Sequence, residues 1–122
     1  MTTAISLFSG AGGMDLGVLQ AGFEVCAAIE VDPHCCETQR ANIEREGRGT
    51  AVIEEDIREV APEKLMQEMG WVPGELDLLF GGPPCQSFSQ IGKQQGLEDK
   101  RGLLLFEMPR FAKALRPKVV LI

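Results

Sequence analysis

The chain has 122 residues, of which 44% are hydrophobic and 25% charged, and its formal net charge is −6 at pH 7. This length and composition predict one ordinary globular domain with a modest core. No stretch approaches the roughly 18 apolar residues of a membrane-spanning helix, and the N-terminus lacks a signal peptide's basic start, so we expect a cytoplasmic protein without a membrane partner. An acidic chain is also poorly suited to grip nucleic acid alone, because phosphate contacts need clustered lysine and arginine.

Strand-like apolar runs alternate with helix-like segments along the chain. Strands are expected at residues 4–8, 23–31, 50–54 and 76–80, with a fifth beginning at residue 118. Helices are expected at residues 14–21, from 33 to about 46, at 62–69 and at about 102–115. This alternation predicts an α/β fold with a parallel sheet covered on both faces. Pro109 conflicts with the last helix, because an interior proline costs about 3 kcal/mol or forces a kink or a late start.

Candidate site residues follow four of the expected strands. They are residues 9–13, Glu30, Asp56 and Cys85. In parallel α/β sheets, ligands bind beyond the carboxyl ends of the strands. Because these four strand ends converge on one rim, together they indicate a ligand site more strongly than any one of them does.

A glycine-rich turn follows the first expected strand. Its members are Phe8, Ser9, Gly10, Ala11, Gly12 and Gly13. Glycines let the backbone approach a ligand and present N–H groups at a helix start, although such a turn can also be purely structural. Asp15 replaces the third glycine of a dinucleotide fingerprint, and no Gly-Lys-Ser/Thr follows, which weighs against a dinucleotide and a nucleoside triphosphate.

Two carboxylates at later strand ends suit a nucleoside ligand. Glu30 lies 20 residues after Gly10 (30 − 10), the spacing at which an acidic residue accepts hydrogen bonds from ribose hydroxyls. The alternative for Glu30 is a solvated charge at a strand end. Asp56 has the position to receive an adenine amino group, although a capping or surface aspartate is the commoner role.

Cys85 follows two prolines just beyond the fourth expected strand, which holds it away from the core. Thiolate is the reactive form of cysteine, and Lys93, Lys100 and Arg101 on the following loop supply positive charge that favours it. The alternative is a small core residue. The four cysteines form no C-x-x-C pair, so no zinc or other metal site is expected, and reduced thiols are the simplest interpretation.

These residues resemble the cytosine-5 DNA methyltransferase family along essentially the whole chain. Residues 8–17 (FSGAGGMDLG) are similar to its first motif, Glu30 to the second and residues 56–57 to the third. Residues 82–89 (GPPCQSFS) resemble the fourth motif, which is the most specific, and residues 101–106 (RGLLLF) resemble the fifth.

The resemblance implies a Rossmann-like fold that binds S-adenosyl-L-methionine, and it implies specific roles for several residues. The glycine-rich turn and Glu30 would hold the cofactor, with Val31 packed on adenine. Asp56 and the Ile57 backbone would read the adenine edge, while Pro83 and Leu104 would wall the site. Cys85 would be the nucleophile that adds to cytosine carbon 6. Residues expected to face a flipped-out DNA base are Gln86, Ser87, Phe88, Ser89, Lys93 and Arg101.

The chain departs from the family pattern at its end. The family continues after the fifth strand with Glu-Asn-Val, whereas this sequence stops at Ile122. We therefore expect residues 1–122 to be the N-terminal part of a catalytic domain cut after the fifth strand, inactive alone. Double-stranded DNA would bind through the missing C-terminal part. Exposed apolar surface would favour self-association or a complementary C-terminal chain.

Three other interpretations stay open at this point. A tRNA cytosine-5 methyltransferase would carry the same motifs, and a non-catalytic S-adenosylmethionine-binding or regulatory subunit would carry most of them. A dehydrogenase-type dinucleotide domain is disfavoured by Asp15 and has no use for the Pro-Pro-Cys segment.

Overall fold

The computed structural model describes residues 2–83 and 104–122. Its elements in chain order are β1 (Thr3–Leu7), α1 (Gly13–Gln20), β2 (Glu24–Glu30), α2 (Pro33–Glu46), β3 (Ala51–Glu54), η1 (Ile57–Glu59), α3 (Pro62–Met69), β4 (Leu78–Gly81), η3 (Leu104–Phe106), α5 (Glu107–Leu115) and β5 (Val119–Leu121). All five strands pair in parallel, in the order β3-β2-β1-β4-β5. The predicted α/β class is therefore confirmed.

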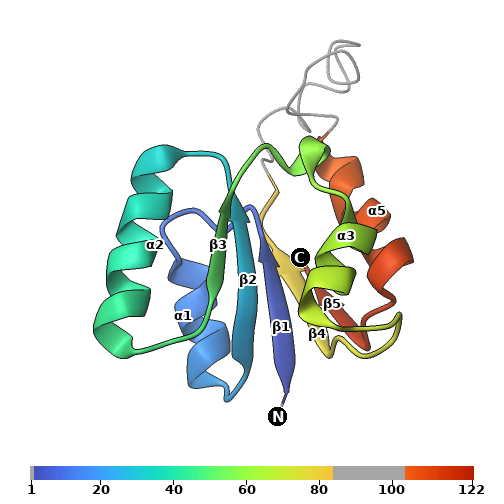
Figure 1. Cartoon of the computed structure of the whole chain (residues 1–122), viewed down its shortest axis with the longest axis horizontal. Helices are drawn as coiled ribbons and strands as arrows, with labels where there is room; N and C mark the ends of the chain where they lie inside the picture. Colours follow the sequence, from blue (N-terminus) through green and yellow to red (C-terminus); the bar gives the residue numbers. More distant parts are fainter. Residues whose placement is uncertain (1, 84–103) are drawn as a thin grey trace.

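Helices cover both faces of this sheet. Figure 1 shows α1 and α2 on one side and α3 and α5 on the other. The alternation of side chains along β1 serves both layers: Ile5 and Leu7 join the larger core with α3 and α5, while Ala4 joins a smaller core with Val18 of α1. Because both faces of this central strand are covered, β1 is buried from Ala4 to Leu7.

Local sequence signals set the ends of α2. The Asp32 side chain accepts hydrogen bonds from the backbone N–H groups of His34, at 2.8 Å, and Cys35, at 3.3 Å. Pro33 occupies the first helical position, where its missing N–H costs nothing. Gly47 ends the helix with a left-handed φ of 65°. The expected helix from residue 33 to about residue 46 is confirmed.

Pro109 sits in the first turn of α5, which begins only at Glu107. The first four N–H groups of a helix have no partner within it, so a proline there loses no hydrogen bond. The short η3 turn precedes α5 in place of further α-helix. The expected α-helical start near residue 102 is therefore wrong for residues 104–106. The late start of α5 explains how the helix accommodates Pro109. Residues 102 and 103 lie outside the described residues.

Gly81 closes β4 against β1, where it pairs with Leu7. A Cβ atom at Gly81 would lie 2.5 Å from the Leu7 carbonyl oxygen, so only glycine permits this spacing. The close approach fixes where the chain leaves the sheet at Gly82 and Pro83.

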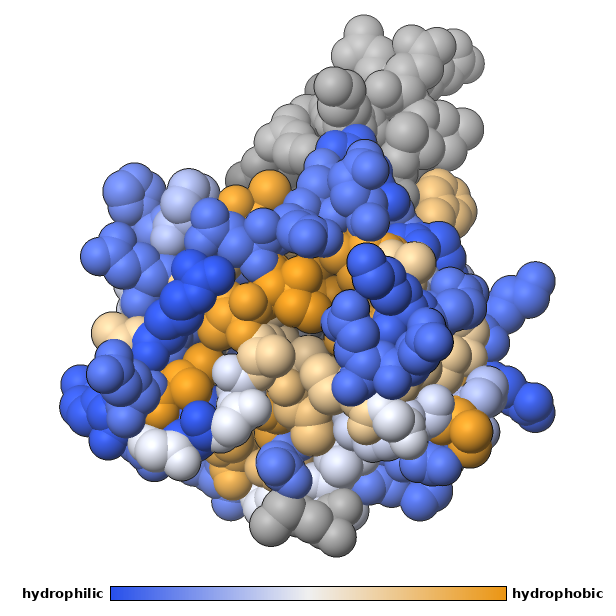
Figure 2. All heavy atoms as spheres, viewed as in Figure 1, coloured by the Kyte–Doolittle hydropathy of each residue, from blue (hydrophilic) through white to orange (hydrophobic). Residues whose placement is uncertain are grey.

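The part of the chain that the structure describes contains no helix long and apolar enough to cross a membrane. The face seen in Figure 2 carries apolar side chains between hydrophilic flanks. The edge strand β3 runs across this face, and its Val52 and Ile53 are half-buried.

Candidate functional site

A cavity of about 370 Å³ lies at the carboxyl ends of the strands. Its lining contains six residues that the sequence predicted to bind a cofactor: Phe8, Glu30, Val31, Asp56, Ile57 and Leu104. It also contains four that sequence reasoning missed: Ile29, Glu55, Arg58 and Gly82. The size is within the range of small-molecule sites, roughly 300–1,000 Å³.

Other predicted residues lie elsewhere. Ala11, Gly12 and Gly13 line a separate cavity of about 340 Å³ that also touches α2. The structure describes Pro83, but Pro83 does not line the 370 Å³ cavity. The preceding residue, Gly82, does line it. The structure thus divides the predicted loop: Phe8 faces the larger cavity, while its glycine-rich end faces α2.

The loop after β1 turns sharply at Phe8. Phe8 has a φ of 54°, a left-handed conformation that a bulky residue adopts only when its surroundings impose it. Next to it, Ser9 donates its backbone N–H to the Ile29 carbonyl at 3.2 Å, and its hydroxyl donates to the same oxygen at 3.3 Å. These bonds hold the loop against the end of β2 and aim Phe8 at the cavity.

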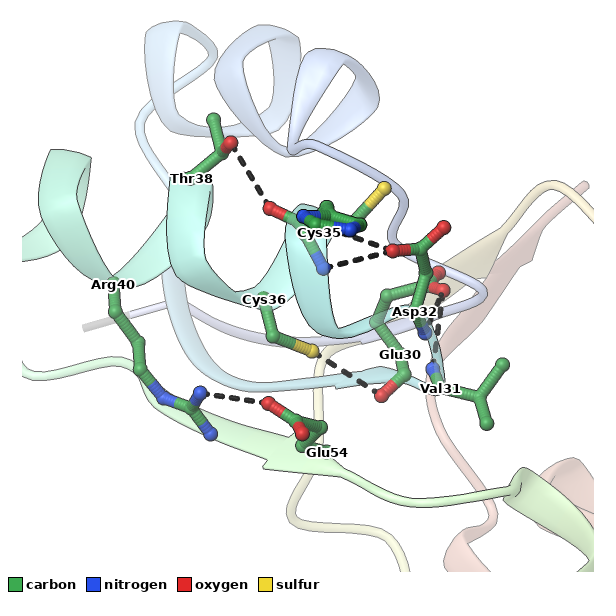
Figure 3. Close-up of polar contacts among 9 residues, drawn as sticks. Glu30, Val31, Asp32, Cys35, Cys36, Thr38, Arg40 and Glu54 are labelled. Atoms are coloured by element: carbon green, nitrogen blue, oxygen red, sulfur yellow. Dashed lines mark hydrogen bonds and ion pairs between the residues drawn. The ribbon is translucent and has the colours of Figure 1, made fainter.

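Glu30 connects the loop to the end of β2. Its Oε1 accepts a hydrogen bond from the Gly10 backbone N–H at 2.8 Å. Its Oε2 accepts from the backbone N–H groups of Val31, at 3.0 Å, and Asp32, at 2.8 Å, as Figure 3 shows. A carboxylate offers about four lone-pair positions, so with three in use one remains for a ligand hydroxyl.

Asp56 caps the short η1 helix. Its carboxylate accepts hydrogen bonds from the Arg58 backbone N–H, at 3.0 Å, and from the Arg58 Nε, at 2.9 Å, and it also pairs with Nη2 of the same side chain. Asp56 therefore has the capping role that was the alternative prediction from the sequence. Asp56 also lines the 370 Å³ cavity, so capping does not remove this residue from the site.

Arg110 on α5 supports the turn that carries Ile57. Its Nη2 donates to the carbonyl oxygens of Ile57, at 2.8 Å, and Val60, at 3.0 Å, while its Nε pairs with Glu107. Sequence reasoning missed Arg110, because an arginine on an amphipathic helix carries no local signal that it will reach a turn 50 residues earlier.

The predicted nucleophile Cys85 lies outside the described residues, as do Gln86, Ser87, Phe88, Ser89, Lys93 and Arg101. Gly82, three residues before Cys85, lines the cavity. The three described cysteines, Cys26, Cys35 and Cys36, carry free thiols. Burial is the largest factor that raises the pKa of each thiol, so these three favour the unreactive protonated form.

The sequence of residues 2–122 matches the C-5 cytosine-specific DNA methylase family. The chain belongs to this family. Among curated relatives, the chain is 47% identical to the Type II methyltransferase M.AquIA of Picosynechococcus, over 93% of the present chain and 44% of the relative. It is 46% identical to M.PspPI of Psychrobacter, over 96% of the present chain and 26% of the relative. The chain thus spans less than half the length of either relative.

Solved structures agree with this assignment. A candidate DNA modification methyltransferase encoded in an Escherichia coli prophage superimposes with a TM-score of 0.76 and 33% identity, over 96% of this chain and 30% of the other. DNMT2 of Spodoptera frugiperda shares the fold, with a TM-score of 0.59 and 23% identity, over 87% of this chain and 30% of the other. The predicted Rossmann-like methyltransferase fold is confirmed.

Family and fold imply S-adenosylmethionine as the cofactor and methyl donor. In the 370 Å³ cavity, Phe8, Ile29 and Leu104 provide apolar walls and Glu30 provides a carboxylate.

Proposed function

We propose that this chain is the cofactor-binding and nucleophile-bearing part of a DNA (cytosine-5-)-methyltransferase. The observation that carries the proposal is the cavity at the strand ends, in which Glu30 stands beside apolar walls in a chain of this family. The methyl group would come from S-adenosylmethionine and go to carbon 5 of cytosine.

The chain's own residues would divide the work of binding the methyl donor. Glu30 accepts a hydrogen bond from one ribose hydroxyl with its remaining lone pair, and Phe8 and Val31 pack on the adenine. Asp56 and the Ile57 backbone meet the polar edge of the adenine, while Leu104 closes the far wall. Residues 9–13 and Pro83 do not line this cavity and would contact the cofactor beyond it.

Cys85 would supply covalent catalysis. Its thiolate adds to carbon 6 of cytosine, and the electrons of the 5,6 double bond make carbon 5 nucleophilic enough to take the methyl group. Loss of the carbon 5 proton and release of the thiolate then restore the aromatic ring. Since the target base lies inside the duplex, it must flip out toward Cys85.

Residues 86–89, Lys93 and Arg101 would contact the DNA near the flipped base. Most contacts to DNA would come from protein beyond this chain, because the chain is acidic and spans 44% or less of these relatives. We therefore expect negligible methyl transfer from this chain alone and activity once a complementary chain is supplied, in the cytoplasm, where bacterial DNA lies.

Calorimetric titration of the purified chain with S-adenosylmethionine tests the cofactor site. Glu30→Ala should weaken binding about tenfold to a hundredfold, because it removes charge-assisted hydrogen bonds to ribose and to the loop. Glu37→Ala, at an exposed position on α2, is the matched control and should leave binding unchanged.

Competing functions give different results in the same titration. Tight binding of NAD in place of S-adenosylmethionine would favour a dinucleotide-binding domain. A folded wild-type chain that binds neither ligand would contradict the proposal. Binding without transfer to DNA, when the rest of the enzyme is present, would favour a tRNA methyltransferase or a non-catalytic subunit.

A further inference from the structure

Gln39 on α2 is a buried amide that reaches the glycine-rich loop. Its side chain is 4% exposed. Its Nε2 donates hydrogen bonds to the Ser9 hydroxyl, at 2.7 Å, and to the Gly10 carbonyl oxygen. No motif of the sequence includes Gln39, and it does not line the 370 Å³ cavity, so the roles assigned above leave it unexplained.

Gly10 is held from both sides. Its N–H donates to the Glu30 carboxylate at 2.8 Å, and its carbonyl accepts from Gln39. Both peptide groups that flank Gly10 therefore have a fixed orientation, at a residue whose φ of 57° few non-glycine residues adopt. Without the Gln39 bond, only the N–H side of this residue would be anchored.

The Ser9 hydroxyl links Gln39 to the end of β2 through two hydrogen bonds. It accepts a hydrogen bond from Gln39 and donates one to the Ile29 carbonyl at 3.3 Å. The same relay thus ties α2 to the loop and the loop to the end of β2. Gly12 lies close to Gln39 as well, since a Cβ at Gly12 would meet the Gln39 Cγ at 3.6 Å.

We propose that Gln39 is a positioning residue that sets the conformation of residues 9–12 before S-adenosylmethionine binds. This proposal rests on the proposed function, in which that loop borders the cofactor. A loop ordered in advance does not lose conformational entropy on binding, so its ligand binds more tightly. Gln39 acts through Ser9 and Gly10 and has no contact of its own with the 370 Å³ cavity.

The chemistry of the contact requires a donor. Both loop groups accept hydrogen bonds from the same Gln39 nitrogen. Gln39→Leu removes the donor at similar volume, while Gln39→Glu keeps size and polarity but turns an ionised acceptor toward two acceptors. A residue needed only to fill space would tolerate both changes. The matched controls are Gln67→Leu and Gln67→Glu, at an exposed glutamine on α3.

Two measurements on the full chain test the proposal. Amide hydrogen exchange, followed by nuclear magnetic resonance, should show faster exchange at the Gly10 and Gly12 N–H groups in both Gln39 variants, with the strands of the sheet unchanged. Titration with S-adenosylmethionine should show a dissociation constant raised about five- to fiftyfold, the loss expected for one or two hydrogen bonds. Ser9→Ala should add little to Gln39→Leu, because both break the same relay.

The two measurements test the positioning role of Gln39 and the proposed methyltransferase function separately. If the wild-type chain binds no S-adenosylmethionine, the proposed function fails, while exchange at Gly10 still decides whether Gln39 orders the loop. Unchanged exchange at Gly10 in both variants would overturn the positioning role. Exchange that rises equally across the whole sheet would also overturn it, because Gln39 would then be a residue of the core and not of the loop.

Discussion

A carboxyl group is buried at the start of α1. Asp15 is 4% exposed, and it accepts a hydrogen bond from the Ser6 hydroxyl on β1 at 2.7 Å. Burial raises the pKa of this carboxyl above its usual 3.8, and the hydrogen bond from Ser6 only partly opposes the shift. Nothing in the sequence alone indicates that Asp15 is buried, because its inward direction depends on how α1 packs on β1.

Asp15→Asn should stabilise the fold at neutral pH. Because the folded pKa is raised, the folded state holds this proton more tightly than the unfolded chain does. Stability is therefore lost as pH rises from about 3.8 through the folded pKa. Asparagine keeps the acceptor for Ser6 without the charge.

Thermal unfolding at two pH values tests this. The variant should melt higher than the wild type at about pH 8, and the difference should shrink toward about pH 4. Glu37→Gln, at an exposed site, should show no such pH-dependent difference. An equal difference in melting temperature between variant and wild type at both pH values would show that ionisation of Asp15 does not destabilise the fold.

At the scale of elements, the cavity depends on helices that do not line it. Helix α5 reaches the turn around Ile57 through Arg110, and α2 reaches the loop around Gly10 through Gln39. Gln39 donates to the Gly10 carbonyl and Arg110 to the Val60 carbonyl, and Arg110 adds a second donor to the Ile57 carbonyl, which already accepts the Val60 N–H at 3.1 Å. The helices on each face of the sheet thus support one part of the site: α2 supports the Gly10 loop and α5 supports the Ile57 turn.

Arg110→Met should destabilise the chain by about 1–3 kcal/mol, because the buried carbonyls of Ile57 and Val60 lose charged donors. Methionine keeps much of the apolar stem. Urea unfolding measures the loss, and Lys113→Met is the control at an exposed site on the same helix. Equal unfolding midpoints for the two variants would mean that water replaces the guanidinium at no cost.

At the scale of the whole molecule, the sheet ends in an exposed apolar strand. In β5 and just beyond it, Val119 is 57% exposed, Val120 41%, Leu121 45% and Ile122 73%. Among the described residues, β5 pairs only with β4, so within this part of the chain its other edge presents unpaired backbone groups. The exposed apolar surface that the sequence led us to expect is present.

This edge should make the chain self-associate at high concentration. Light scattering over a concentration series should show a rising mean mass, and Val120→Lys should lower it, because a charged edge resists strand pairing. Lys113→Glu, a charge change away from the edge, is the control. A monomer at every concentration would contradict the expectation and leave the edge to a different partner chain.

The sequence by itself determined the local structure and the family. Asp32, Pro33 and Gly47 set the ends of α2 through capping rules that involve only near neighbours, and the motifs around Gly10, Glu30 and Cys85 indicated the methyltransferase family. Such signals are readable because a cap, a turn or a reactive motif is complete within a few residues.

The tertiary structure alone decided the strand order and the contacts that support the cavity. Gln39 meets Gly10 across 29 residues, and Arg110 meets Ile57 across 53. Gly81 is required because β4 packs against Leu7 of β1. No local pattern encodes which distant backbone group a side chain will meet, because that partner exists only once the sheet and both helical layers have assembled.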